Sequence, residues 1–140
     1  MAQMNPYLNF NGNCREAMNY YKECFAGNLT LQTVGESPMA SQMPSTAKDS
    51  ILHSMLIAPG VVIMGSDMFW GEFANGNTYH LSVNCDSEQE VNKLYTKFSK
   101  DGRVTQALSQ MPWGAMYGSL IDKFGKSWFF NYTKNNLPDK

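Results

Sequence analysis

Residues 13–27, NCREAMNYYKECFAG, have the pattern of one amphipathic helix with both of its ends marked. Asn13 is a residue type that favours the N-cap, and Glu16 follows three positions later, as in a capping box. Apolar side chains then recur at the spacing of one helix face, and Gly27 stands where a glycine commonly ends a helix. The pattern predicts a helix that packs one face against a core.

The same helix pattern occurs a second time in residues 87–102, SEQEVNKLYTKFSKDG. Ser87 takes the N-cap position, Glu90 follows three positions later, and Gly102 marks the end. Each helix follows one short strand-like segment and precedes three more. The predicted strands are residues 7–11, 29–34, 51–57 and 61–65 in the first half, and residues 79–84, 104–108, 115–121 and 127–132 in the second half.

A βαβββ arrangement that occurs twice predicts an α+β fold. We expect a single domain over residues 1–140, made of two βαβββ modules at about residues 5–66 and 77–134. The loop of residues 66–77, rich in glycine and aromatic residues, joins them. A loop with this much apolar surface normally needs cover, so it is expected to be a lid, a pocket wall or a dimer contact.

Composition excludes several classes of protein. Apolar residues make up 43% of the chain, charged residues only 16%, and the net charge is −1. These values are typical of a globular domain and give no electrostatic basis for binding nucleic acid or an anionic membrane.

The first residues lack the pattern of a signal peptide, so we expect a cytoplasmic protein. Cys14, Cys24 and Cys85 form no C-x-x-C pair, and an odd number argues against a disulfide framework.

Several motifs, in order along nearly the whole chain, resemble those of PhnB-like proteins. They are the opening PYLNFNGNCREA at residues 6–17, His53 in a strand, MGSD at 64–67, Trp113-Gly114 before a strand, and DKFGKSW at 122–128. The chain thus resembles the PhnB-like branch of the vicinal oxygen chelate superfamily, which includes glyoxalases, bleomycin-resistance proteins and dioxygenases. The resemblance implies that the two modules form a curved, cup-like mixed sheet around one pocket, and that the chain forms a homodimer.

One name in use for this branch refers to a demethylubiquinone methyltransferase. The sequence contains no glycine-rich S-adenosylmethionine loop after a strand, so that name carries little weight for the activity. The usual motifs of phosphate-binding loops, zinc proteases and serine hydrolases are also missing from the sequence.

Metal-using relatives hold a divalent ion with His and Glu side chains from four strands. Mapped through the motifs, those positions fall here on Pro6, Met64, Thr78 and Phe129. None of these side chains is a normal ligand for such an ion, and a slip in register recovers only His80. We therefore expect no metal and no cofactor.

The sequence offers two kinds of candidate site residue. His53 and Asp67, which match motifs of the family, are the candidates for catalysis, and His53 could serve as a pocket acid or base. Asp122 is expected to hold its own turn instead. Aromatic side chains suit the stacking of a flat organic ligand. The predicted ligand-binding set is His53, Met64, Trp70, Thr78, His80, Trp113, Tyr117 and Phe129.

Two functions fit these residues. The first is a metal-independent protein that binds a small organic molecule in an aromatic cup, for sequestration, sensing or resistance. The second is a lyase, isomerase or transferase that uses His53 or Asp67 without a metal, or with a metal in a non-standard site. A core role for each aromatic residue is the alternative to both.

Overall fold

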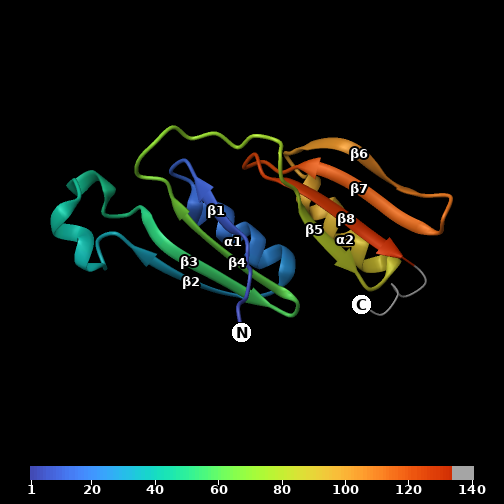
Figure 1. Ribbon diagram of the computed structural model, residues 1–140, viewed down its shortest axis with the longest axis horizontal. Coiled ribbons are helices and arrows are strands. Elements are labelled where there is room, and N and C mark those ends of the chain that lie inside the picture. Colours follow the sequence, from blue (N-terminus) through green and yellow to red (C-terminus); the bar gives the residue numbers. More distant parts are fainter. Residues whose placement is uncertain (134–140) are drawn as a thin grey trace. The chain divides into compact units, whose positions relative to one another are not determined.

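Two βαβββ units follow one another along the chain (Figure 1). The computed structural model describes residues 1–133. One unit spans Met1–Ala74, and the second begins at Asn75. The first contains β1 (Tyr7–Phe10), α1 (Cys14–Phe25), β2 (Asn28–Thr33), β3 (Ile51–Ala58) and β4 (Val61–Asp67). The second contains β5 (Leu81–Cys85), α2 (Glu88–Ser99), β6 (Arg103–Gln110), β7 (Ala115–Ile121) and β8 (Ser127–Thr133).

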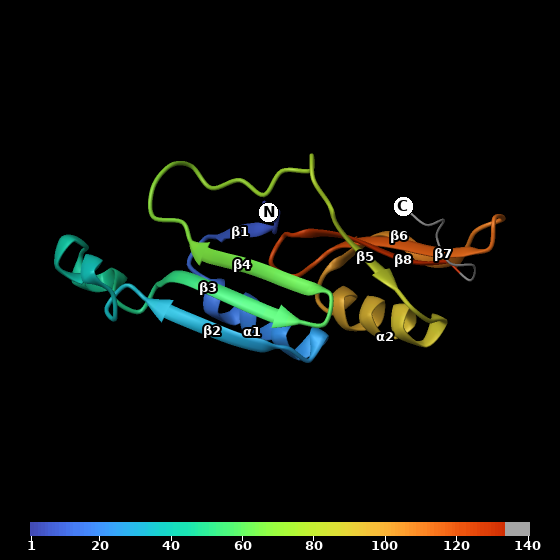
Figure 2. The same ribbon diagram turned by 60° about the horizontal axis from the view of Figure 1, so that its bottom comes forward.

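The two sheets have the same topology. Their strand orders are β1-β4-β3-β2 and β5-β8-β7-β6. In each sheet the first strand runs parallel to the last, and the remaining neighbours are antiparallel. Figure 2 shows each helix lying along one face of its own sheet. The predicted α+β fold with two βαβββ modules is confirmed.

The start of α1 differs from the prediction. The Asn13 side chain makes no capping hydrogen bond. The carboxylate of Asp67 takes that role, because its Oδ1 accepts the backbone N–H of Cys14 at 3.0 Å. The other oxygen, Oδ2, accepts the backbone N–H of Ile51 at 2.8 Å. Asp67 thus ties the end of β4 to the beginnings of α1 and β3.

The end of α1 also differs from the prediction. Ala26, with φ of 54°, is the residue in the left-handed conformation, and Gly27 is not. Gly27 is needed for another reason, since a Cβ atom there would lie 2.7 Å from the backbone oxygen of Ile57. The glycine lets the chain pass close to β3 as β2 begins.

The second helix begins as predicted. The Ser87 hydroxyl accepts the backbone N–H of Glu90 at 3.0 Å, and the Glu90 carboxylate accepts the backbone N–H of Asp86 at 2.8 Å. The capping interaction is therefore local, which is why the sequence alone could predict it.

The turn between β7 and β8 is held by Asp122, as expected. Its backbone oxygen accepts the N–H of Gly125 at 2.9 Å, and its Oδ1 accepts those of Phe124 at 2.8 Å and Lys126 at 3.0 Å. Its Oδ2 accepts the indole N–H of Trp128 at 2.9 Å. This motif fixes the side chain of Trp128 in the core beneath α2, where it packs on Phe98.

One predicted segment needs correction. Tyr79 and His80 lie before β5 rather than in it, because β5 begins at Leu81. Between β2 and β3, the chain forms the short 3-10 helices η1 (Pro38–Gln42) and η2 (Ser45–Ala47). No helix within residues 1–133 is long and apolar enough to cross a membrane.

Candidate functional site

Each sheet has a second face, opposite its helix, and some of the predicted site residues lie there: His53, Met64, His80, Tyr117 and Phe129. Side chains of a strand alternate between the two faces. In the first unit Gly65 faces α1, because a Cβ atom there would lie 3.4 Å from the sulfur of Met18. Its neighbour Met64 therefore belongs to the other face, together with Tyr7 and Met55, which are its partners in register.

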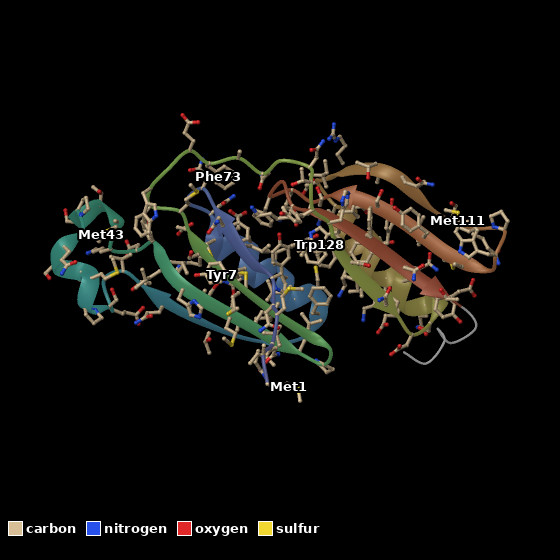
Figure 3. All side chains as sticks on the ribbon, viewed as in Figure 1. Met1, Tyr7, Met43, Phe73, Met111 and Trp128 are labelled. Atoms are coloured by element: carbon tan, nitrogen blue, oxygen red, sulfur yellow. The ribbon has the colours of Figure 1, made fainter. Side chains whose placement is uncertain are left out.

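Tyr7 and His53 form a contact on this open face of the first sheet. The Tyr7 hydroxyl and Nδ1 of His53 are 3.4 Å apart, and the ring centroids are 5.9 Å apart. Tyr7, labelled in Figure 3, projects from β1, whereas His53 comes from β3. A phenol beside an imidazole is a pair that can pass a proton.

The open face of the second sheet carries a cluster of three rings: His80, Phe129 and Tyr117. His80 stacks on Phe129, with centroids 3.9 Å apart and planes 15° apart. Tyr117, on the neighbouring strand β7, lies beside Phe129 on β8, with ring centroids 5.5 Å apart. Phe129 and Tyr117 are half-buried, and His80 is exposed. We call these three residues the ring cluster.

Neutral polar side chains surround the ring cluster. Ser82 and Ser119 are the partners of Phe129 in register on β5 and β7. Asn131, opposite Tyr117, donates its side-chain N–H to Oδ1 of Asn84 at 3.3 Å. Sequence reasoning missed these four residues and Tyr7, because the register of paired strands is not written in local sequence.

The four mapped metal positions are divided between the two units: Pro6 and Met64 lie in the first, and Thr78 and Phe129 lie in the second. The backbone N–H of Met64 donates to the backbone oxygen of Pro6 at 3.1 Å, Phe129 is paired with Ser82, and Thr78 is exposed in the segment before β5. Within residues 1–133, no three His, Cys, Asp or Glu side chains form a group that could hold a metal ion.

Two predicted ligand-binding tryptophans are largely exposed. Trp70 is 71% exposed and has a ring contact with Phe69, at 6.1 Å between centroids. Trp113 is 73% exposed, in the turn between β6 and β7. This exposure argues against a core role for either side chain. His53 lies in the first unit and His80 in the second, so a single pocket that holds both stays a prediction.

Asp67 and Cys85 are buried for structural reasons. Both carboxylate oxygens of Asp67 already accept backbone N–H groups, and the side chain is 5% exposed.

Burial, with the nearby carboxylates of Glu90 and Asp86, raises the pKa of the Cys85 thiol to about 12. A thiol that stays protonated at neutral pH is a poor nucleophile, which argues against a catalytic cysteine here.

The chain is similar to known proteins over nearly its whole length. The protein PA1353 from Pseudomonas aeruginosa is 32% identical, with a TM-score of 0.86 over 96% of this chain and 100% of that one. YjdN of Escherichia coli (strain K12) is 27% identical over 94% of this chain and 95% of the relative. A PhnB protein from Bacillus cereus is 23% identical, with a TM-score of 0.78 over 94% of this chain and 100% of that one.

More distant structures share the fold alone. A glyoxalase/bleomycin resistance protein/dioxygenase domain from Frankia sp. EAN1pec is 13% identical, with a TM-score of 0.66 over 96% of this chain and 98% of that one. A family model described as 3-demethylubiquinone-9 3-methyltransferase matches residues 2–130. The chain therefore belongs to this PhnB-like family, and its fold is that of the glyoxalase/bleomycin resistance/dioxygenase proteins.

Proposed function

We propose that this protein binds a small organic molecule on the open face of the sheet β5-β8-β7-β6, without a metal. The observation that carries the proposal is the stack of His80 on Phe129, beside Tyr117. Rings that are partly accessible on a rigid sheet offer a flat ligand further stacking at little cost in side-chain entropy. Neutral amides and hydroxyls around them supply the few polar contacts that fix a ligand's orientation.

The place of the rings in the sheet supports a binding role over a core role. Phe130 and Trp128, on the same strand, face α2 and are buried, so the core beneath α2 is filled without the ring cluster. Phe129 alternates with them and is therefore on the other side of the sheet. A family relationship does not name a ligand, since one fold hosts many functions.

Fluorescence titration with N-phenyl-1-naphthylamine, a flat apolar probe, tests this proposal. We expect saturable binding to the wild-type protein, a loss of about tenfold or more in affinity for Phe129→Ala, and little change for Glu72→Gln in the exposed loop. Equal affinity of all three proteins, or no saturable binding by the wild type, would refute the proposed site.

A second function, acid–base catalysis, is favoured by the contact between Tyr7 and His53. A flat ketone with exchangeable protons, such as acetophenone in D₂O, is a suitable probe. Exchange catalysed by the wild type, reduced in His53→Gln and retained in His80→Gln, would support catalysis at this pair. Asp67 is a weaker candidate, because both of its oxygens are already engaged.

We also propose that the protein forms a homodimer with twofold symmetry. The supporting observation is the exposed Trp70 in an apolar loop, since aromatic side chains of this kind are enriched in interfaces. Light scattering that gives only the 15.8 kDa monomer would overturn this. The cytoplasmic location stays a prediction from the sequence.

A further inference from the structure

The charged residues of the chain avoid its strands. Of 11 Lys and Arg and 12 Asp and Glu residues, only Asp67 and Arg103 lie within the eight strands. The two helices, by contrast, carry charges along their exposed sides, as Lys93 and Lys97 do on α2. The sheets therefore present faces with almost no formal charge.

Neither of the two exceptions lies on a strand that carries the ring cluster. Asp67 is in the first unit and faces α1, where its carboxylate accepts the N–H of Cys14. Arg103 is the first residue of β6, an edge strand, and is paired with Ile121 on β7. Two strands, β7 and β8, separate β6 from β5, which His80 precedes.

Within the strands, the polar side chains paired with or next to the rings are neutral. Ser119 shares a hydrogen bond of 2.6 Å with the hydroxyl of Thr105, so it is already partnered. Asn131 and Asn84 share one hydrogen bond and together retain three amide N–H groups and the carbonyl oxygen of Asn131 for a ligand. This set can recognise a carbonyl, hydroxyl or amide group, but it offers no cation to offset a carboxylate, sulfonate or phosphate.

From this charge pattern we infer that the ligand is an electrically neutral, flat aromatic molecule with at least one polar group. The inference rests on the proposed function and adds the chemical class of the ligand. An anion that leaves water for an aromatic face loses hydration, and sites that take anions normally supply Arg, Lys or converging N–H groups in return. The strands β5, β7 and β8, which carry or adjoin the ring cluster, contain no Arg or Lys.

A matched pair of fluorescent probes tests the charge preference. N-phenyl-1-naphthylamine and 8-anilino-1-naphthalenesulfonate share one ring system and differ by the sulfonate. We expect the wild-type protein to bind the neutral probe at least about tenfold more tightly, at about pH 8. Equal affinities, or tighter binding of the sulfonate, would overturn the inferred ligand class.

A variant with one added cation makes the test sharper. Asn131→Lys places an ammonium group beside Tyr117, so we expect it to bind the sulfonate probe about tenfold or more tightly than the wild type. Gln89→Lys adds the same charge at an exposed position of α2 and should leave sulfonate binding unchanged. If both variants gain equally, the effect is general attraction, and the inference fails.

A folding defect in Asn131→Lys would not end the test. Asn84→Lys places the cation on β5, at an exposed position next to Asn131, and should give the same gain. The two proposals also fail differently. If the wild type binds neither probe, the proposed function is wrong. If it binds both equally, with both lost in Phe129→Ala, only the neutral ligand class is wrong.

Discussion

The carboxylate of Asp67 accepts the first backbone N–H of α1, that of Cys14, across 53 residues of sequence. Since it also accepts the N–H of Ile51, we predict that Asp67→Asn lowers the free energy of unfolding by about 1–3 kcal/mol. An amide presents only one acceptor atom and sets its own N–H against a backbone donor. Urea unfolding measures the change.

Asp49→Asn is the matched control, because Asp49 is exposed and undergoes the same chemical change. We expect its free energy of unfolding to stay within about 0.5 kcal/mol of the wild type. Similar losses in the two variants would show that the buried position of Asp67 does not matter.

Replacement of two tryptophans should reduce stability by very different amounts. Trp128 is 1% exposed, packs on Phe98 and donates its indole N–H to Asp122, so Trp128→Ala should cost about 3–5 kcal/mol of stability. Trp113 is 73% exposed, so Trp113→Ala should cost no more than about 0.5 kcal/mol. Comparable losses in urea unfolding would contradict the burial described for both.

Cys85 makes the stability fall at alkaline pH. The pKa of its thiol rises from the ordinary 9.0 to about 12 on folding, because of burial first and then the nearby carboxylates. Between these values the unfolded chain releases a proton that the folded chain keeps, so the free energy of unfolding decreases as pH rises. We expect Cys85→Ala to show a shallower decrease.

Urea unfolding of both proteins at about pH 8, 9.5 and 11 measures this difference. Burial also raises the pKa of Tyr95, which adds a loss in the same direction and remains in the variant. The comparison between the two proteins therefore isolates Cys85. Identical decreases in the two proteins would rule out this role for the thiol.

The purified protein should carry no stoichiometric divalent metal. Met64 and Phe129 occupy two of the positions that supply ligands in metal-using relatives, and their register partners, Tyr7 and Ser82, are not the usual carboxylate or imidazole ligands. Elemental analysis after dialysis measures the content. One equivalent of Zn, Ni, Mn or Fe per chain would contradict a metal-independent site.

Local patterns predicted much of the fold. The repeated helix signature predicted α1 and α2, and the capping interaction of Ser87 with Glu90 could be predicted because its partners are three residues apart. The turn at Asp122 was predictable for the same reason, since its carboxylate bonds to N–H groups within four residues. Short-range hydrogen bonds leave a signature in sequence that needs no knowledge of tertiary structure.

Contacts between residues far apart in the sequence were not predicted. The cap of α1 comes from Asp67 at the end of β4, so the sequence around Asn13 pointed to the wrong acceptor of that hydrogen bond. The contact of Tyr7 with His53 depends on the register of three strands. His80 was placed in a strand, but β5 begins one residue later, and strand ends carry only a weak alternation signal. Its stacking on Phe129 could not be read from either position alone.

The imidazole signals of His53 and His80 give the most direct test of ligand binding at the ring cluster. These are the two histidines of the chain, one in each unit, so each reports on one open face. NMR spectra recorded during titration with 1-naphthol, and assigned with His53→Gln and His80→Gln, follow both at once. The proposed site predicts a saturable shift of the His80 signal that disappears in Phe129→Ala. A His80 signal that does not move, or moves equally in Phe129→Ala, would contradict it.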